Sequence, residues 1–469
     1  MNFCKSANKR LNLFYFTRAQ LFAEKKLYLP YEKRPCICQN NTYSAEQKRI
    51  RDMSFATTIT RAWLTRSFKP FSFQNEYDDF LPFEECEHLG LYVHIPFCKS
   101  ICTFCPYCKT VYRKEQCDRY INALIKEIHK VGGQYERKKE TTSLYFGGGT
   151  PALIANRIEE IIAAIQEHFI ITEGIGVELH PANVNVETLK RLKNAGVTKI
   201  SIGVQSFLEK FETLLGRKKV DAQQLKDTLA TVEFETVSMD FIFALPDQTY
   251  EDIKSDVYTA FASGANHVAI YPFIDFSFTQ SKVKSMPKKQ KRELLDQITN
   301  YFNQKGYYRS SIWTFSNQKK AQYSSMTRDN FLGFGCSATS LLKKQFKINT
   351  FSVDEYCKRL DGDELPTSLT IRFTERQRMV YYLFWTLYSM QLDERDFEHF
   401  FGVPLGKKYG FEFGLAQKLG LLTKDNGIYS MTMKGAFYYH YYEQFYTLSY
   451  IDKMWGIMKE EAFPRQIRI

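Results

Sequence analysis

The stretch HIPFCKSICTFCPYCK, residues 94–109, decides how the rest of the chain is interpreted. It holds four of the 11 cysteines, and three of them, Cys98, Cys102 and Cys105, are spaced C-x3-C-x2-C. The segment directly follows LYVHI, a short apolar run typical of a buried strand. Clustered thiols predict a metal centre here rather than a disulfide scaffold, because disulfide-rich proteins are small and this chain has 469 residues.

Three thiolates cannot complete an all-cysteine ligand set for an iron–sulfur cluster. They leave one iron open to a small bidentate ligand, and S-adenosylmethionine could occupy it through its amino and carboxylate groups. The alternative is a tetrahedral zinc ion that uses all four thiols of the segment, with Cys108 as the fourth ligand. The role of Cys108 stays open: it could ligate nothing, shield a cluster or act at the substrate. His94 is expected to be an ordinary core histidine.

Continuous apolar runs alternate with amphipathic helical patterns from residue 91 to residue 273. The six predicted strands are LYVHI at 91–95, SLYFGG at 143–148, GVELH at 176–180, KISIGVQ at 199–205, SMDFIFAL at 238–245 and HVAIYPF at 267–273. Such runs are typical of parallel strands buried on both faces, and the helices between them predict right-handed βαβ units. We therefore expect an α/β fold with a curved, partial (β/α)6 barrel, whose reactive groups lie at the carboxyl ends of the strands.

Composition divides the chain into four predicted segments. Residues 1–70 form a basic N-terminal extension, with 14 Lys and Arg against 4 Asp and Glu, which contributes +10 to the net charge of +12. Residues 71–285 form the barrel core, and residues 286–366 form a barrel extension with substrate-side elements. Residues 367–469 hold three helical patterns and a hairpin turn at Asn426-Gly427, which predict a helical, winged-helix-like domain. The extension is expected to be solvated, or to be missing if translation starts at Met53.

Several classes of protein do not fit this composition. The chain has no apolar run of membrane-spanning length, and its first residues lack a continuous apolar signal region, so we expect a cytoplasmic protein without a membrane span. Nucleic-acid binding is not expected, because the helical patterns after residue 367 offer few Lys and Arg for phosphates. The 30 Tyr and 39 Phe favour large cores and a flat apolar ligand.

The cysteine loop, together with YVHIPFC at 92–98, resembles that of the radical S-adenosylmethionine (radical SAM) superfamily. Within it, the stretch resembles the oxygen-independent coproporphyrinogen III oxidase-like family, which includes haem chaperones and anaerobic haem-degrading enzymes. The resemblance implies a radical SAM barrel and a [4Fe–4S] cluster held by Cys98, Cys102 and Cys105. It also implies S-adenosylmethionine as the second cofactor, bound at the open iron.

Later motifs are similar to the family's cofactor-binding positions and follow in the same order. The resemblance implies that S-adenosylmethionine is bound by Tyr92, Phe104, Gly147, Gly148, Gly149, Thr150, Glu178, Gln205, Arg217 and Asp240. In this reading GGGTP contacts the methionine amino group, Glu178 the ammonium or ribose hydroxyls, Arg217 the carboxylate and Asp240 the ribose. No residue is assigned to catalysis on the substrate.

The resemblance implies an oxidoreductase that produces a 5′-deoxyadenosyl radical and acts on a porphyrinogen or another tetrapyrrole in haem metabolism. It implies an electron donor such as flavodoxin or ferredoxin. The chain departs from the oxidase pattern, because Cys105 and Cys108 are spaced C-x2-C rather than C-x-C. It departs from the chaperone pattern as well, because YSSMTRDNFLGFG replaces the haem-binding motif. Two alternatives therefore stay open: a haem chaperone that keeps the cluster, and a radical SAM methyltransferase that opens haem anaerobically.

Overall fold

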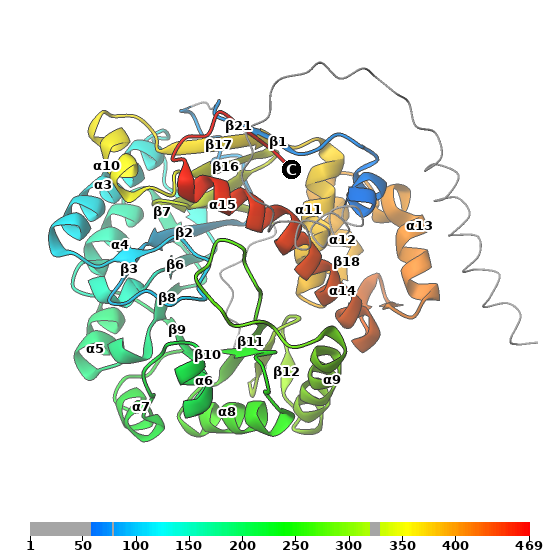
Figure 1. The fold of residues 1–469 in the computed structure, drawn as a ribbon. Coiled ribbons are helices and arrows are strands. Elements are labelled where there is room, and N and C mark those ends of the chain that lie inside the picture. The colour runs from blue at the N-terminus through cyan, green and yellow to red at the C-terminus, as the bar shows by residue number, and fades with distance from the viewer. Residues whose placement is uncertain (1–57, 77–78, 319–328) are drawn as a thin grey trace, which may run out of the picture. The chain divides into compact units, whose positions relative to one another are not determined.

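A sheet of parallel strands forms the centre of the computed structural model, which describes residues 58–76, 79–318 and 329–469 (Figure 1). Six parallel strands lie next to one another in the order β2-β6-β8-β9-β10-β11. Their bounds are Leu89–Ile95, Leu144–Gly148, Ile175–Leu179, Lys199–Gln205, Thr236–Phe243 and His267–Pro272. The outer neighbour of β2 is β14 and that of β11 is β13, so the barrel is open. The predicted α/β fold with a partial barrel is confirmed.

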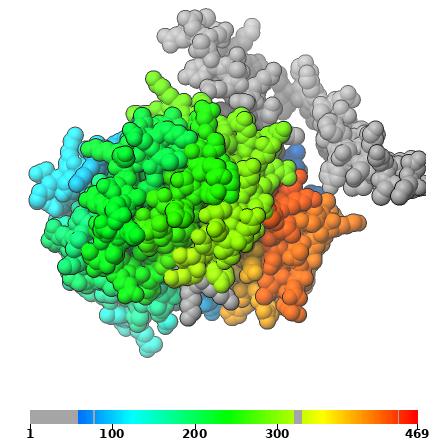
Figure 2. Space-filling view, turned by 90° about the horizontal axis from the view of Figure 1, so that it is seen from below, coloured from blue at the N-terminus to red at the C-terminus, as the bar shows by residue number. Residues whose placement is uncertain are grey.

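Helices connect these strands and cover the outer face of the sheet, as Figure 1 shows. The helical patterns expected between the strands are present as α3 (Lys114–Gly132), α4 (Ile158–Gln166), α5 (Val186–Asn194), α7 (Ala222–Leu229) and α8 (Tyr250–Ala262). Two further helices are α6 (Glu209–Leu214) and α9 (Lys288–Gln304), and the green part of Figure 2 shows α6 to α9 on one face. Each helix buries an apolar stripe on the sheet; in α4 the stripe includes Ile158, Ile161 and Ile165.

The sheet continues beyond the six strands on both sides. Strand β14 (Asn330–Phe334) pairs in parallel with β2, and β15 (Thr339–Leu342), β16 (Gln345–Asn349) and β17 (Thr367–Arg372) follow in antiparallel order. Strands β1 (Ser72–Gln74) and β21 (Gln466–Arg468) complete this side, and β13 (Thr314–Ser316) and β12 (Tyr308–Arg309) extend the other. The stretch FLGFGCSATS is thus strand β14, a turn and strand β15. This arrangement brings Cys336 to the carboxyl end of β14, beside β2.

The C-terminal region has a separate hydrophobic core. It contains α11 (Glu375–Tyr388), α12 (Glu394–Phe401), α13 (Leu405–Lys418) and a small sheet of β18 (Gln391–Asp393), β20 (Ile428–Met431) and β19 (Leu422–Asp425). The hairpin turn lies at Asn426 and Gly427, whose φ angles of 47° and 84° are those of a type I′ turn. The helical C-terminal region was therefore predicted correctly.

Two helices at the end of the chain were not predicted. Helix α14 (Met433–Tyr446) and helix α15 (Asp452–Glu460) lead back from the C-terminal region towards the barrel, and Figure 1 shows both in red. In α15, Lys459 Nζ donates a hydrogen bond to the Pro106 carbonyl at 2.8 Å. The ring of Trp455 lies 6.0 Å from that of Tyr107. Helix α15 therefore covers the cysteine loop.

The structure describes part of the predicted N-terminal extension. Residues 58–65 are helical, and Arg66 forms an ion pair with Glu412 of α13 at 2.6 Å. The predictions for residues 1–57, including a start at Met53, lie outside the described residues. Among the residues that are described, the structure has no helix of the length and apolar character that a membrane span requires.

Candidate active site

The cysteine loop lies at the carboxyl end of β2. It runs from β3 (Phe97–Cys98) to β4 (Thr110–Val111), and these two short strands pair in parallel. Two backbone hydrogen bonds of 2.7 and 2.9 Å close the base of the loop. The half-buried thiols of the loop are those of Cys98, Cys102 and Cys105. The fold therefore presents the predicted ligand trio at the end of the barrel where reactive groups were expected.

Hydrogen-bond donors approach two of these thiols. The Thr150 hydroxyl donates to Cys98 Sγ at 3.7 Å, and Arg217 Nη1 donates to Cys102 Sγ at 3.4 Å. Burial raises the pKa of the Cys98 thiol to about 11, and the neighbouring sulfurs of Cys105 and Cys102 add to the rise. The Cys98 thiol is therefore neutral at pH 7 until a bound metal cation displaces its proton.

The distances between the three sulfurs distinguish a site for a cluster from a site for a single metal ion. A tetrahedral zinc site would hold neighbouring sulfurs about 3.8 Å apart. In the described part of the chain, Cys98, Cys102 and Cys105 do not form a group whose sulfurs all lie within 4.8 Å of one another. Cys108 is buried, and its Sγ lies 3.8 Å from that of Cys336. The trio therefore fits a larger, multi-iron cluster, and the four-cysteine zinc alternative lacks its fourth ligand.

The glycines of GGGTP pack the end of β6 directly on neighbouring strands. Gly148 has a φ of +121°, and a Cβ there would lie 2.7 Å from His94 Cε1. A Cβ on Gly149 would lie 2.7 Å from the Phe97 carbonyl oxygen. These positions are restricted to glycine by contacts within the chain, and the close packing holds Thr150 against the cysteine loop.

Two carboxylates lie on strands β8 and β10: Glu178 is next to the last residue of β8, and Asp240 lies in the middle of β10. Glu178 accepts one hydrogen bond from the Tyr145 hydroxyl at 2.8 Å and another from the Gly148 N–H at 3.1 Å. Both carboxylate oxygens of Asp240 lie 2.9 Å from the Ser201 hydroxyl. Within the described ranges, neither carboxylate forms an ion pair. Carboxylates of this kind are suited to a ligand that brings its own positive charge.

The two carboxylates influence each other. Burial raises the pKa of Glu178 above its ordinary value, although its two hydrogen bonds oppose the rise. Burial also raises the pKa of Asp240 to about 7, and the charge of Glu178 adds to this effect. A cation placed between them would lower both pKa values, because it would stabilise both ionised forms. Perturbed carboxylates at the end of a barrel are typical of functional sites.

Strand β9 bulges where it faces Asp240. The pairing of β10 with β9 shifts between Met239 and Phe241, so that β9 carries one extra residue there. Gln205 ends the strand with a φ of +74°, which is unusual for a residue other than glycine. Arg217 donates a hydrogen bond to the Gly203 carbonyl as well as to the cysteine loop. The guanidinium of Arg217 therefore links the bulged end of β9 to the cysteine loop.

Two predicted aromatic residues differ in their surroundings. The ring of Tyr92 stacks on that of Tyr145, with centroids 6.2 Å apart and planes 13° apart, and a Cβ on Gly147 would lie 3.0 Å from it. The Tyr92 hydroxyl lies 3.0 Å from His94 Nδ1. Phe104 instead packs in an apolar cluster with residues of α6 and of β10, so it anchors the loop.

Partial exposure marks the predicted residues within otherwise buried strands. Tyr92 is the one half-buried residue of β2, and Glu178 is the one half-buried residue of β8. Asp240 is one of two such residues in β10. The ring of Tyr92 stacks on Tyr145, which donates to Glu178, and the charge of Glu178 acts on Asp240. The structure therefore brings these three residues together at the inner face of the barrel.

Sequence reasoning missed two supporting residues. Tyr145 donates to Glu178, and Ser201 donates to Asp240. The signal was present, because side chains on one face of a strand recur every second residue. Tyr145 shares a face with Gly147, and Ser201 shares one with Gly203 and Gln205. The contacts of α15 with the cysteine loop had no comparable signal.

Known proteins share both the sequence and the fold of this chain. Residues 92–257 match the family model described as the Radical SAM superfamily. The chain is 28% identical over 359 residues to the heme chaperone HemW of Lactococcus lactis, which covers 73% of this chain and 93% of that protein. It is 24% identical over 331 residues to the oxygen-independent coproporphyrinogen III oxidase of Synechocystis, covering 65% and 70% of the two chains. The solved structure of coproporphyrinogen III oxidase (HemN) from Escherichia coli superimposes with a TM-score of 0.68 at 22% identity, over 82% of this chain and 98% of that one, and so shows the same fold.

Radical SAM proteins use a [4Fe–4S] cluster and S-adenosylmethionine. The donors found here fit both groups: three separated thiols leave one iron without a protein ligand, and two carboxylates beside them lack a cationic partner among the described residues. Residues 92–257 form a radical SAM domain, and the chain is similar in sequence to the HemW chaperones and the oxygen-independent coproporphyrinogen III oxidases.

Proposed function

We propose that this protein is a radical SAM oxidoreductase that acts on a tetrapyrrole, in the manner of a coproporphyrinogen dehydrogenase. One observation carries the proposal: three half-buried thiols follow strand β2, and strands β8 and β10 of the same sheet carry two carboxylates that lack a cationic partner among the described residues. S-adenosylmethionine complements this arrangement, because it combines a sulfonium and an amino group with a carboxylate and ribose hydroxyls.

Each group has a role in binding the cofactors. Cys98, Cys102 and Cys105 would ligate three irons, and the fourth iron would take the amino and carboxylate groups of S-adenosylmethionine. Arg217, whose Nη1 lies 3.4 Å from Cys102 Sγ, offers a guanidinium to that carboxylate. Glu178 offers an acceptor to the ammonium or ribose hydroxyls. The contacts of Tyr92, Gln205 and the glycines at 147–149 support a position for the cofactor at the same strand ends.

The chemistry belongs to the cofactors. When bound, they supply one-electron cleavage of a carbon–sulfur bond, which yields a carbon radical able to remove a hydrogen atom from a substrate. The protein positions the reactants and excludes water. Helix α15 contributes to this exclusion, because Lys459 and Trp455 contact the loop at Pro106 and Tyr107. We infer a one-electron donor such as flavodoxin or ferredoxin, and a reducing compartment such as the cytoplasm, where the thiols of the loop stay free.

Aromatic side chains near the loop support a flat macrocyclic substrate. Tyr107 is 53% exposed and Tyr271, near the end of β11, is 43% exposed. Trp455 of α15 stacks on Phe276, with centroids 6.4 Å apart and planes 9° apart. Such faces can hold a tetrapyrrole. Removal of a hydrogen atom from a propionate side chain, followed by loss of carbon dioxide and transfer of one electron to an external one-electron acceptor, would leave a vinyl group.

A haem chaperone is the second candidate. The match with HemW extends over 93% of that protein, a larger share than the 70% of the Synechocystis oxidase. In this case the chain would hold haem and turn over little S-adenosylmethionine. A methyltransferase that opens haem is the third alternative, and the same experiment distinguishes it.

The test is anaerobic turnover with a panel of tetrapyrroles. Reconstituted protein is incubated with dithionite, S-adenosylmethionine and either coproporphyrinogen III or haem, and products are identified by mass spectrometry. An oxidase forms 5′-deoxyadenosine and a product that lacks carbon dioxide and two hydrogen atoms per reacted propionate. Stable haem binding with negligible 5′-deoxyadenosine would assign the chaperone function instead, and a methylated linear tetrapyrrole would assign the methyltransferase function. Protein without iron and without 5′-deoxyadenosine formation would overturn the proposal as a whole.

A further inference from the structure

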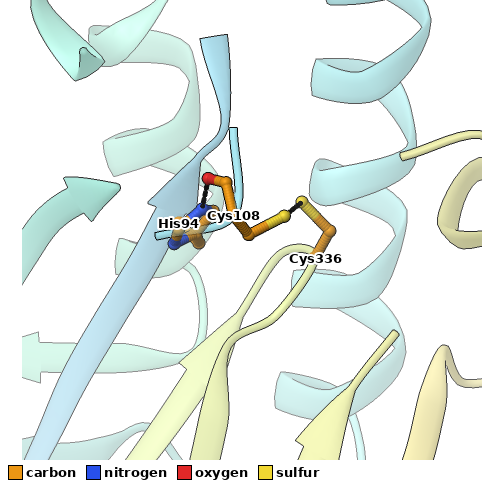
Figure 3. A group of neighbouring side chains, drawn as sticks. All are labelled: His94, Cys108 and Cys336. Carbon is orange, nitrogen blue, oxygen red and sulfur yellow. Dashed lines mark hydrogen bonds between the residues drawn. The ribbon is translucent and has the colours of Figure 1, made fainter. Parts of the chain in front are cut away.

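His94, Cys108 and Cys336 form a buried group beside the cysteine loop, as Figure 3 shows. Their exposed fractions are 3%, 7% and 0%. One ligand atom from each lies within 4.8 Å of the other two, and the two sulfurs are 3.8 Å apart. None of the three belongs to the trio assigned to the iron–sulfur cluster, so the function proposed above leaves this group unexplained.

We propose that His94, Cys108 and Cys336 bind one zinc ion, at a site separate from the cluster. Three protein ligands of this kind leave the fourth tetrahedral position to water or another small ligand. The inference goes beyond the proposed function, since it concerns a second metal and holds whichever reaction the cluster supports.

The distances fit a single ion. With zinc–sulfur bonds of 2.3 Å and tetrahedral angles, two thiolates lie about 3.8 Å apart. The observed separation between Cys108 Sγ and Cys336 Sγ has this value before any metal is added. The three cysteines of the trio are spread more widely, so the two groups of thiols favour different metal centres.

Charge also favours a divalent ion at this site. Two buried thiolates would carry two negative charges, and burying such charges without compensation is costly. A zinc ion with two thiolates and a neutral imidazole is electrically neutral. The two thiols release two protons when the ion binds. Thiolate sulfur and imidazole nitrogen are ligands that zinc prefers, whereas magnesium and calcium prefer oxygen.

His94 has a partner that suits metal binding. Its Nδ1 lies 3.0 Å from the Tyr92 hydroxyl, and its Nε2 lies 2.9 Å from the Cys108 carbonyl oxygen. The Cys108 carbonyl can only accept, so in this structure Nε2–H donates to it and Nδ1 accepts from the Tyr92 hydroxyl. Zinc bound through Nε2 replaces the bond to the carbonyl, and the imidazole proton moves to Nδ1, which then donates to the Tyr92 hydroxyl. A hydrogen bond of this kind fixes the tautomer and the ring orientation of a metal-binding histidine. Tyr92 therefore connects the zinc site with the cofactor end of the barrel.

The turn that carries Cys336 is held rigidly. Two backbone hydrogen bonds fix its position. The Cys336 N–H donates to the Tyr120 hydroxyl at 2.9 Å, and the Gly335 N–H donates to Glu127 at 2.7 Å. Gly335 has a φ of +98°, and a Cβ there would lie 2.7 Å from the His94 carbonyl oxygen. Since β14 also pairs with β2, both ligands are fixed before an ion arrives.

The test is metal analysis of the full chain. Protein is purified and reconstituted without oxygen, supplied with zinc and iron, cleared of loosely bound metal, and analysed for both elements. We expect about one zinc per chain in addition to about four irons. Cys336→Ser and Cys108→Ser should each lower zinc below about 0.1 per chain while the iron content stays unchanged. Cys357→Ser, which changes another buried thiol, is the matched control and should keep the zinc.

A second measurement avoids interference from the cluster. In a variant with Cys98, Cys102 and Cys105 all changed to Ala, cobalt(II) replaces zinc, and its absorption reports thiolate ligation directly. A sulfur-to-cobalt charge-transfer band that disappears in the additional Cys336→Ser background supports the site. Zinc that is absent from the replete protein, or that persists in both Cys108→Ser and Cys336→Ser, would overturn it. Loss of iron alone would count against the proposed function and not against the zinc site.

Discussion

The cysteines of one short loop occupy two different environments. Cys98, Cys102 and Cys105 are half-buried, and their sulfurs do not all lie within 4.8 Å of one another. Cys108 is buried, and its sulfur lies 3.8 Å from that of Cys336, 228 residues further along the chain. Four thiols that look equivalent in the sequence are thus divided by the fold into an open trio and one member of a buried group.

The spacing of cysteines in the sequence therefore does not by itself show which of them share a metal site. The pairing of the strands around the loop decides this. The pairing of β3 with β4 closes the loop below the trio. The pairing of β2 with β14 brings Cys336 to His94 and Cys108, and this contact is made between distant segments. Local sequence therefore carries the first arrangement, while the second depends on which strand becomes the neighbour of β2.

Loss of one thiol from the trio is expected to have the largest effect, and it tests whether the trio and the buried group are separate sites. Cys102→Ala should reduce iron from about four per chain to near zero and abolish formation of 5′-deoxyadenosine, because two thiolates cannot hold the cluster. Iron analysis, the visible absorption spectrum and product analysis measure the effect. Cys336→Ser is the control, and it should keep the iron. Equal iron loss in both variants would mean that the fold does not divide the thiols as described.

The fold was predictable where strands are buried on both faces. Each of the six central strands is an apolar run, and the structure places all six in the predicted order. The antiparallel strands β15 to β17 mix polar and apolar residues, so they gave no comparable signal. Helix α14, which contains FYYHYYEQFY, was missed because its aromatic residues are spread around the helix instead of forming one stripe.

The candidate site was predictable in part. The motifs around Glu178 and Asp240 resemble the family's cofactor-binding positions, and this resemblance indicated that both residues share a region with the trio. Two properties could be recognised only in the three-dimensional structure. Neither carboxylate has a cationic partner among the described residues, and the pKa of Asp240 is raised. The separation of Cys108 from the trio could not be read from C-x2-C spacing, since it results from the burial of Cys336 beside β2.

Removal of the Asp240 carboxylate tests the proposed binding site for S-adenosylmethionine. Asp240→Asn should weaken binding of S-adenosylmethionine by about 10- to 100-fold, which corresponds to the roughly 1–3 kcal/mol of a lost charged hydrogen-bond acceptor. The iron content should stay unchanged. Anoxic calorimetry on the reconstituted protein measures the affinity. Asp227→Asn on the exposed face of α7 is the control, and equal affinities for both variants would remove Asp240 from the binding site.

The pKa of Asp240 predicts a smaller effect of pH. In the unliganded protein this pKa is about 7, so about nine-tenths of the carboxyl groups are protonated at pH 6. Ribose hydroxyls and a cationic ligand favour the ionised form, so binding lowers the pKa and releases a proton. The affinity therefore rises as the pH rises through 7. If binding lowers the pKa by about two units, the affinity at pH 6 is about tenfold lower than at pH 8.

Calorimetry at pH 6 and pH 8 measures this dependence. The amino group of S-adenosylmethionine also titrates, so the contribution of Asp240 is the difference between the wild-type protein and Asp240→Asn. The variant should show a clearly smaller change between the two pH values. Identical pH profiles would show that Asp240 stays in one protonation state, whatever the overall affinity.

The smallest expected effect concerns the support of Glu178. Tyr145→Phe removes the hydroxyl that donates to Glu178 at 2.8 Å and leaves the ring that stacks on Tyr92 in place. Loss of about 1 kcal/mol should lower the affinity for S-adenosylmethionine by about fivefold. Loss of a donor to the carboxylate also raises the pKa of Glu178 further, so the pH midpoint of binding should move upward. Tyr92 also contacts His94, so the zinc content of this variant is measured as well. An unchanged zinc content would confine the effect to the S-adenosylmethionine site. Loss of zinc would show that this site and the buried group are coupled through the stacked tyrosines.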